Sequence, residues 1–228
     1  GWDAHGAECY VVPNAFVQAA ADREPAEEGG AFTFLAAGRF SDYVKGADLL
    51  FRAFAAVHAA HPQARLVVAS DEPRFEEILR PAERGAVTFT GWLDRTRLHA
   101  AMQAADVVVV PSRYEPFGLM AVEAMAMGTP VIAMAVGGLV EIVHHGLTGW
   151  LCPPGEGSFG LRLAMEEAVR DPRLTRALGR NARRTARREF SLARVAGLVR
   201  AHLDNALLEE RRRSAYRAAP ALSERGTP

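Results

Sequence analysis

The feature that most restricts the fold of this chain is a series of short, continuous apolar runs separated by longer segments with helical periodicity. Val107–Val110 consists of four valines, and Val131–Met134 is equally free of polar residues. Runs without alternation are typical of strands that are covered on both faces, as in parallel sheets. Because parallel strands need helical crossovers, the pattern predicts an α/β fold with helices on both sides of a sheet.

Runs of this kind alternate with helical patterns up to about residue 152. The predicted strands are Phe32–Ala37, Arg65–Ala69, Val87–Thr90, Val107–Val110, Val131–Met134 and Trp150–Leu151. The helices predicted between them are Ala47–His61, Arg74–Arg84, Arg95–Ala105, Leu119–Met127 and Leu139–His145. After Pro153-Pro154-Gly155, three more helices are expected near 158–170, 173–189 and 192–213. We therefore expect a Rossmann-like, doubly wound parallel sheet of about six strands with C-terminal helices.

The chain divides into three parts. Residue 1 is a glycine, and residues 1–30 resemble an interior segment of a longer chain. We therefore expect them to hold the end of an N-terminal domain and an interdomain linker. Residues 31–200 contain the predicted sheet and are expected to form the main domain. Residues 201–228 are expected to hold the end of the last helix and, from Ala218, a disordered tail of small and polar residues.

The composition excludes several classes of protein. With 49% hydrophobic residues, the chain is too apolar for a disordered protein, and its apolar runs are far shorter than the roughly 20 residues of a membrane-spanning helix. Two cysteines, Cys9 and Cys152, cannot form a disulfide framework or a zinc site by themselves. The start of the chain does not resemble a targeting peptide. We therefore expect a soluble, cytoplasmic protein.

The charge is balanced overall, with 27 basic and 27 acidic residues, but residues 161–228 hold 16 arginines against 8 acids. A solvated helix face is the simpler explanation of this excess, and contact with an anionic membrane surface is the less favoured one. We expect no nucleic acid as a partner. Only one basic residue, Lys45, is a lysine, which indicates either chance or a position where a compact ammonium suits better than a planar guanidinium.

The segment from Pro111 to Pro130 is the most informative for function. A strand ends near Pro111, and a helix begins near 117–119. The free N–H groups of the first helical turn, with Gly118 permitting close approach, are expected to form an anion site that suits pyrophosphate. Since ligands of such sheets bind beyond the carboxyl ends of the strands, this loop is a candidate site.

Two carboxylates lie eight residues apart in this segment. Glu123 is the only charged residue between Pro116 and Val140, so it either faces water at an edge or accepts hydrogen bonds from the two hydroxyls of a ribose. Glu115 lies on the loop, where Pro116 restricts its backbone to extended conformations. On its own, Glu115 is better explained as an acid that complements the helix dipole.

The loop 38–46 follows the first predicted strand and supplies two cations. Arg39 and Lys45 are expected to project toward the same edge of the sheet as Glu115. Two cations there would bind a diphosphate and neutralise it as a leaving group. Either residue alone is also explained as an ordinary surface charge.

Together these residues resemble the retaining glycosyltransferases of family 4, also called group 1, in their C-terminal, nucleotide-sugar-binding domain of GT-B architecture. Glu115 and Glu123 are similar to the family's Glu-x7-Glu motif, and Gly38-Arg39…Lys45-Gly46 looks like its Gly-Arg…Lys-Gly element. Further segments resemble family elements in the same order: Val12-Pro13-Asn14, Gly137-Gly138-Leu-Val-Glu141 and Gly146-Leu-Thr-Gly149. The resemblance extends from about residue 11 to residue 200.

The resemblance implies a donor site formed by Arg39, Lys45, Glu115, Phe117, Gly118, Leu119 and Glu123. Arg39 and Lys45 would bind the diphosphate, Glu123 the ribose and Glu115 the donor sugar, so that Glu115, Arg39 and Lys45 are the expected catalytic residues. Backbone N–H groups of 117–119 would help to hold the sugar and phosphates, and the base would lie near 91–93. The implied reaction transfers a hexosyl group with retention and requires neither metal nor cofactor. A UDP-sugar is the expected donor, with GDP- or ADP-sugar as alternatives.

Two positions depart from the family pattern. The segment Ala69–Pro73 replaces a Gly-x-Gly turn, and Ala15 replaces a glycine after Val-Pro-Asn. The acceptor would be bound by an N-terminal domain that this chain does not contain. The alternative function is a non-catalytic nucleotide-sugar-binding module or scaffold. A nucleotide-sugar epimerase of the same architecture lacks support, because Glu-x7-Glu is a transferase feature.

The remaining polar residues offer weaker signals. Six of the seven histidines show no metal-ligand spacing with a carboxylate, so we expect surface or capping roles for His5, His58, His61, His99, His144 and His145. Cys152 is expected to be a small core residue. Trp92 is explained equally by stacking on a base and by packing.

Overall fold

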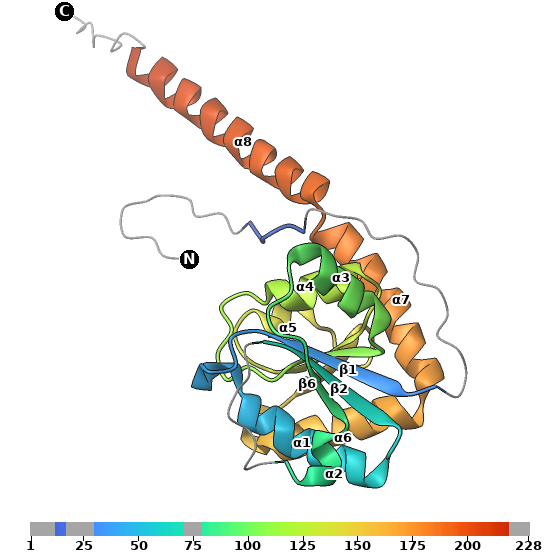
Figure 1. The fold of residues 1–228 in the computed structure, drawn as a ribbon. Helices are drawn as coiled ribbons and strands as arrows, with labels where there is room; N and C mark the ends of the chain where they lie inside the picture. Colours follow the sequence, from blue (N-terminus) through green and yellow to red (C-terminus); the bar gives the residue numbers. More distant parts are fainter. Residues whose placement is uncertain (1–11, 17–29, 71–78, 219–228) are drawn as a thin grey trace, which may run out of the picture.

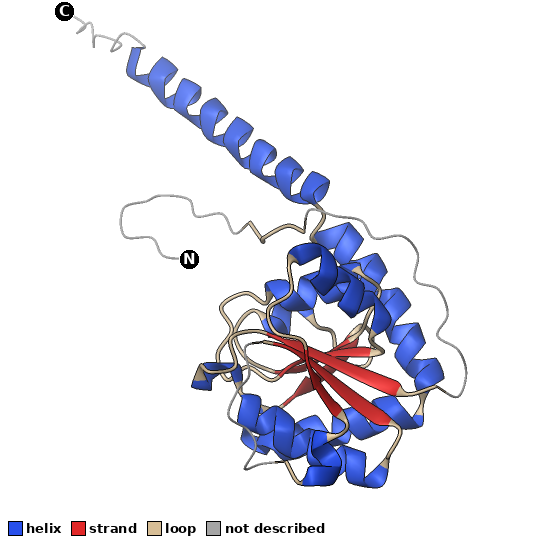
Figure 2. Ribbon diagram, viewed as in Figure 1, coloured by secondary structure: helices blue, strands red, loops and turns tan. Residues whose placement is uncertain are grey.

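A six-stranded sheet, in the order β3-β2-β1-β4-β5-β6, lies between two layers of helices (Figure 2). All five strand pairs are parallel. The strands are β1 Phe32–Ala37, β2 Ala64–Ala69, β3 Val87–Phe89, β4 Val107–Val110, β5 Val131–Met134 and β6 Gly149–Cys152. The structure is a computed structural model that describes residues 12–16, 30–70 and 79–218. The predicted Rossmann-like fold is confirmed.

The helices follow the strands in chain order (Figure 1). They are α1 Ala47–Ala60, α2 Pro81–Arg84, α3 Arg95–Ala104, α4 Leu119–Ala126, α5 Leu139–Ile142, α6 Gly157–Arg170, α7 Pro172–Glu189 and α8 Leu192–Ala218. Two short 3-10 turns, Tyr43–Lys45 and Pro154–Glu156, precede α1 and α6. No helix among the described residues has the length and apolarity needed to cross a membrane.

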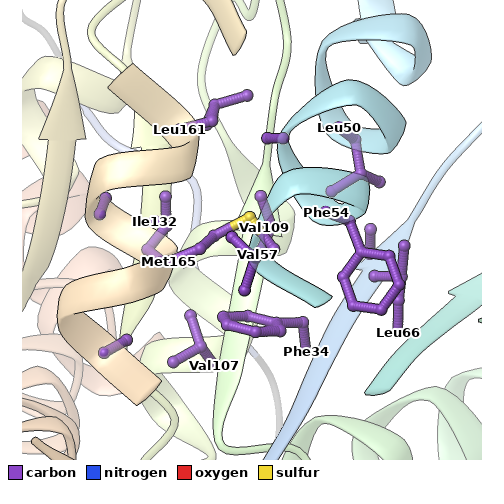
Figure 3. Close-up of a cluster of buried hydrophobic side chains, with 14 of the residues drawn as sticks. Phe34, Leu50, Phe54, Val57, Leu66, Val107, Val109, Ile132, Leu161 and Met165 are labelled. Carbon is purple, nitrogen blue, oxygen red and sulfur yellow. The ribbon is translucent and has the colours of Figure 1, made fainter. Parts of the chain in front are cut away.

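Adjacent residues of the central strands enter different cores, which explains why their sequences are continuously apolar. Phe34 packs with α1 and α6 on one face, whereas Leu35 packs with α4 and α7 on the other. Figure 3 shows the first core, in which side chains of α1 and α6 meet those of the strands. Burial of each large aliphatic or aromatic side chain contributes about 1.5–3 kcal/mol, so both layers hold the sheet.

The structure corrects two of the predicted helix ends. The helix expected to reach His145 stops at Ile142, because the chain turns back toward β6 and the hydroxyl oxygen of Thr148 accepts a hydrogen bond of 2.9 Å from the His144 N–H. The last helix runs to Ala218 instead of ending near residue 213. Of the helix expected over 74–84, only Pro81–Arg84 falls within the described residues. The tail expected to be disordered lies outside them after Ala218.

The long helix α8 projects away from the sheet and its two helix layers (Figure 1). Val195 near its start is buried, but Val199, Leu203 and Leu207 are exposed. At the junction of α7 and α8, the Phe16 N–H donates a 3.0 Å hydrogen bond to the carbonyl oxygen of Phe190. The segment 12–16 therefore meets the chain where it leaves the domain.

Candidate functional site

The loops with the predicted site residues follow β1 and β4, which are neighbours in the sheet. The chain continues from β1 to β2 on one side and from β4 to β5 on the other, so the order of the strands reverses between β1 and β4. In doubly wound sheets, ligands bind at this switch point, outside the carboxyl ends of the strands. The loops 38–46 and 111–118 lie where a ligand is expected.

Close backbone contact joins these two loops. Gly46 has a φ of +66°, and a Cβ at this position would lie 2.0 Å from the carbonyl oxygen of Pro111. The Arg113 N–H donates a 2.7 Å hydrogen bond to the carbonyl oxygen of Val44. Since only glycine combines this backbone conformation with this approach, the turn that carries Lys45 is held against the loop after β4.

Arg113 strengthens the same junction with its side chain. Its guanidinium makes two hydrogen bonds of 2.7 Å to the carboxylate of Asp48 in the first turn of α1, and it lies 3.9 Å from the ring centroid of Tyr43. The hydrogen bonds from Arg113 lower the pKa of the Asp48 carboxyl. Sequence reasoning missed this pair, because its members are 65 residues apart and neither has a distinctive sequence context.

Lys45 and Glu115 come together as a direct ion pair. The Lys45 Nζ lies 2.8 Å from Glu115 Oε2, and the two side chains are 33% and 16% exposed. Both groups therefore retain contact with solvent while the pair fixes their positions. The prediction placed them at one edge of the sheet, and the structure brings them into contact. A ligand that presents an anion to Lys45 and a hydroxyl group to Glu115 would meet both at once.

Arg39 lies on the same loop as Lys45 but is not joined to the pair. Its side chain is exposed and makes no hydrogen bond or ion pair with any residue that the structure describes. A free guanidinium at this edge remains available for an anionic ligand. Its predicted role at a diphosphate stays a prediction.

Gly137 and Gly138 pack on the backbone of the loop that carries Glu115. A Cβ on Gly137 would lie 2.0 Å from the Glu115 carbonyl oxygen, and one on Gly138 would lie 2.3 Å from that of Phe117. The Gly138 N–H also donates a 3.0 Å hydrogen bond to the Glu115 carbonyl oxygen. This contact explains the Gly-Gly pair that the sequence singled out: it fixes the backbone at the start of α4.

The N-terminus of α4 is open toward this edge. Gly118 has a φ of +109° and no side chain caps the helix. The amide N–H groups of Phe117, Gly118 and Leu119 have no hydrogen-bond partner within the described part of the chain. The Phe117 ring packs edge-on against Phe190. Unpaired N–H groups at a helix N-terminus attract anions.

Glu123 lies one turn further along α4 and lines a cavity of about 200 Å³. This cavity lies at the carboxyl ends of β1, β2 and β3 and is formed by Ala37, Gly38, Ala69, Trp92, Leu93, Leu98, Met120 and Glu123. Its walls are apolar apart from the Glu123 carboxylate. Trp92, which is 60% exposed, borders the cavity. That the region 91–93 receives a base stays a prediction.

Two residues of α3 approach the Glu123 carboxylate. An Arg95 N–H donates a 3.0 Å hydrogen bond to Glu123 Oε1, and His99 Nε2 lies 3.7 Å from the same oxygen. The sequence prediction for His99 was wrong, because the residue is only 8% exposed and lies beside Glu123 instead of at the surface. The sequence could have indicated this burial, because His99 lies on the same side of the predicted helix as the apolar residues Leu98 and Met102.

The segment Ala69–Pro73, which departs from the family pattern, begins beside this cavity. Ala69 lines the cavity beside Glu123, and Ser70 is buried next to it, where its hydroxyl oxygen accepts a hydrogen bond from the Phe40 N–H. Residues 71–73 lie outside the described residues.

Across the described ranges 12–16, 30–70 and 79–218, no group of three metal-ligating side chains is found.

A second cavity, of about 530 Å³, lies between β6 and α6. Its polar groups come from His145, Glu156 and Glu167, and it shares no residue with the cavity beside Glu123. Cys152 lines it, and burial, with a smaller effect of Glu156, raises the pKa of this thiol to about 12. A thiol with this pKa is not a nucleophile at neutral pH, which agrees with the prediction of a core residue.

Comparison with known proteins identifies a family. A family model described as “Glycosyl transferases group 1” matches residues 17–185. The chain is 35% identical to glycogen synthase of Mycobacterium tuberculosis over 159 residues, which are 68% of this chain and 38% of that protein. It is 44% identical to D-inositol 3-phosphate glycosyltransferase of Mycobacterium leprae over 117 residues, or 47% of this chain and 26% of that protein. The chain thus spans less than half the length of these relatives.

Solved structures show the same fold. Sucrose-phosphate synthase from Thermosynechococcus elongatus aligns with a TM-score of 0.67 and 38% identity, over 79% of this chain and 46% of that one. HepE of Anabaena, solved in complex with UDP-glucose, aligns with a TM-score of 0.66 and 28% identity, over 76% and 49% of the two chains. The sheet and its flanking helices match those of GT-B glycosyltransferases.

Proposed function

The chain belongs to the group 1 glycosyltransferase family, and we propose that it is the donor-binding domain of an enzyme that transfers a hexosyl group, with retention of configuration, from a nucleotide-diphosphate sugar to an acceptor. The observation that carries this proposal is the arrangement along α4. Its open N-terminus adjoins the Lys45–Glu115 pair, and Glu123 lines a cavity one turn further on. These groups would receive, in order, a diphosphate with its sugar, a ribose and a base.

The diphosphate would bind between the open amide groups at 117–119 and the side chains of Lys45 and Arg39. During transfer, the bond between the anomeric carbon and the diphosphate oxygen breaks, and that carbon forms a bond to the acceptor oxygen. The acceptor proton passes to the departing phosphate oxygen on the same face of the sugar. Positive charge from Lys45 and Arg39 would stabilise the negative charge that develops on the leaving group.

Glu115 would accept hydrogen bonds from the donor sugar, and Glu123 would accept them from the ribose. The apolar cavity beside Glu123 would receive the base next to Trp92 and Leu93. UDP is the nucleotide we favour, because HepE was solved with UDP-glucose. GDP and ADP are the alternatives against which UDP binding has to be compared.

The acceptor would bind to a further domain, for which the arrangement of the chain provides an attachment point. Phe16 is buried and is hydrogen-bonded to Phe190, so the segments that lead into and out of the domain lie side by side. Such proximity is usual where a domain joins its neighbour. Residues 1–30 would then hold the end of that N-terminal domain and the interdomain linker, and residues 201–228 the end of the C-terminal helix and a tail.

Calorimetric titration of the chain with UDP, GDP and ADP tests the donor site. We expect saturable binding of one nucleotide, UDP, in preference to the other two. Glu123→Ala should weaken UDP binding about tenfold, because the ribose loses its charged acceptor. The matched control is Glu167→Ala. Glu167 is an exposed glutamate that lines the second cavity, so this change should leave the UDP affinity unchanged.

Two outcomes decide against parts of the proposal. Failure of all three nucleotides to bind at millimolar concentration would contradict the donor-binding function. Full UDP affinity in Glu123→Ala would remove the ribose role of that residue. Formation of a glycosylated product by an enzyme that contains this chain would exclude the non-catalytic alternative.

A further inference from the structure

The buried histidine of α3 has a ring nitrogen without a partner. His99 is 8% exposed, and its Nε2 atom is buried without a hydrogen bond to any described residue. Buried polar groups are nearly always hydrogen-bonded, so such an atom requires an explanation. Glu123 Oε1 lies 3.7 Å from this nitrogen. This separation exceeds a hydrogen bond, but a small movement of the Glu123 side chain would close it.

Only one side of the Glu123 carboxylate is contacted by α3. Arg95 and His99 both approach Oε1, whereas Oε2 makes no hydrogen bond or ion pair with the described residues, and Glu123 lines the cavity. An ionised carboxylate can accept about four hydrogen bonds. Even if both α3 residues donated to Oε1, capacity would remain for both hydroxyls of a ribose.

We propose that His99 is a positioning residue for nucleotide binding: its Nε2–H holds the Glu123 carboxylate in the orientation that receives the ribose. The inference rests on the proposed ribose role of Glu123. Arg95 contacts the same oxygen, but its side chain is 53% exposed, and an exposed ion pair contributes little. His99 is enclosed, so its hydrogen bond forms without competition from water. On binding, Glu123 moves onto His99 and the unpaired nitrogen gains its partner.

The test compares UDP with 2′-deoxy-UDP, which lacks one of the hydroxyls that Glu123 would bind. For each variant of the chain, we measure the dissociation constant for 2′-deoxy-UDP divided by that for UDP. A high ratio means a strong preference for UDP. We expect His99→Leu to lower the preference for UDP about fivefold. His99→Gln should retain the preference, since its amide nitrogen can donate from nearly the same place. Glu123→Ala should lower the ratio to about one.

The controls separate positioning from packing. Met102→Leu changes a buried side chain on the same helix while conserving volume, and it should leave the ratio unchanged. A general loss of packing in His99→Leu would weaken both nucleotides equally, and an unchanged ratio there would overturn the inference. If Glu123→Ala also leaves the ratio unchanged, the ribose role itself fails. If Glu123→Ala lowers the ratio and His99→Leu does not, only the positioning role fails.

Discussion

At the scale of single residues, side chains outside the expected donor set hold the donor residues in place. Arg113 joins the loop after β4 to the first turn of α1 through Asp48 and covers the ring of Tyr43, two residues before Lys45. A bidentate pair of this kind fixes orientation as well as distance. The position of Lys45 beside Glu115 therefore depends on a pair that does not need to touch a ligand.

The Asp48–Arg113 pair predicts a pH-dependent contribution to stability. Because Arg113 lowers the pKa of Asp48 in the folded chain, the pair stabilises the fold above the ordinary carboxyl pKa of about 4. This contribution disappears as the pH falls through the lowered pKa. Asp48→Asn should reduce the melting temperature by a few degrees at pH 7 and by less near pH 3, as measured by circular dichroism.

The control for this experiment is Asp204→Asn. Asp204 is an exposed aspartate of α8, so its replacement should not change the melting temperature at either pH. An equal loss of stability at both pH values in Asp48→Asn would show that the ionised pair is not responsible.

At the scale of elements, the site is formed by loops that pack backbone against backbone. Gly138 has ordinary helical dihedral angles, so the backbone conformation does not require a glycine there. The lack of space does: a Cβ would lie 2.6 Å from Phe117 Cα and 2.3 Å from its carbonyl oxygen. Contacts this short force a shift of backbone. The start of α5 thereby determines where the open N-terminus of α4 lies.

Gly138→Ala should displace the start of α4 and lower both stability and nucleotide affinity. We expect a cost of about 1–3 kcal/mol in the free energy of unfolding, typical of overpacking, and a UDP affinity at least several-fold weaker by calorimetry. Gly155→Ala is the matched control, because a methyl group at this position would have no atom within 4 Å. Equal behaviour of the two variants would contradict the steric argument.

At the scale of the whole molecule, the sheet domain and the outer part of α8 are energetically separate. Val195 is buried against the domain, whereas Val199, Leu203 and Leu207 are exposed along the projecting helix. Helices gain most of their stability from packing of an apolar face. These side chains therefore add little to the stability of the sheet domain, and under the proposed function they would contact the acceptor-binding domain.

Truncation after Gly197 should leave the melting temperature of the chain within about 2 °C of its original value. Leu178→Ala on α7, where the side chain is 2% exposed, serves as the contrast and should cost about 2–5 kcal/mol. Hydrogen exchange should show weaker protection for residues beyond 199 than for α7. A large drop in melting temperature after truncation would mean that the part of α8 beyond Gly197 also stabilises the sheet domain.

The sequence by itself determined the fold and the order of the site residues along the chain. Continuous apolar runs such as Val107–Val110 predict strands covered on both sides, and the observed strand has the predicted bounds. The spacing of Glu115 and Glu123 places one on a loop and the other on the helix that follows. These inferences succeed because they depend on local periodicity and on residues close in sequence.

Only the tertiary structure decided which side chains meet. Lys45 and Glu115 are 70 residues apart and form a direct pair, and His99 reaches Glu123 from a different helix. Arg113 and Asp48 likewise meet only because β1 and β4 are neighbours in the sheet. Such contacts depend on how separate elements pack, and the sequence pattern of one element does not specify which neighbour it faces. Periodicity fixes the face that a residue occupies, and packing selects its partner.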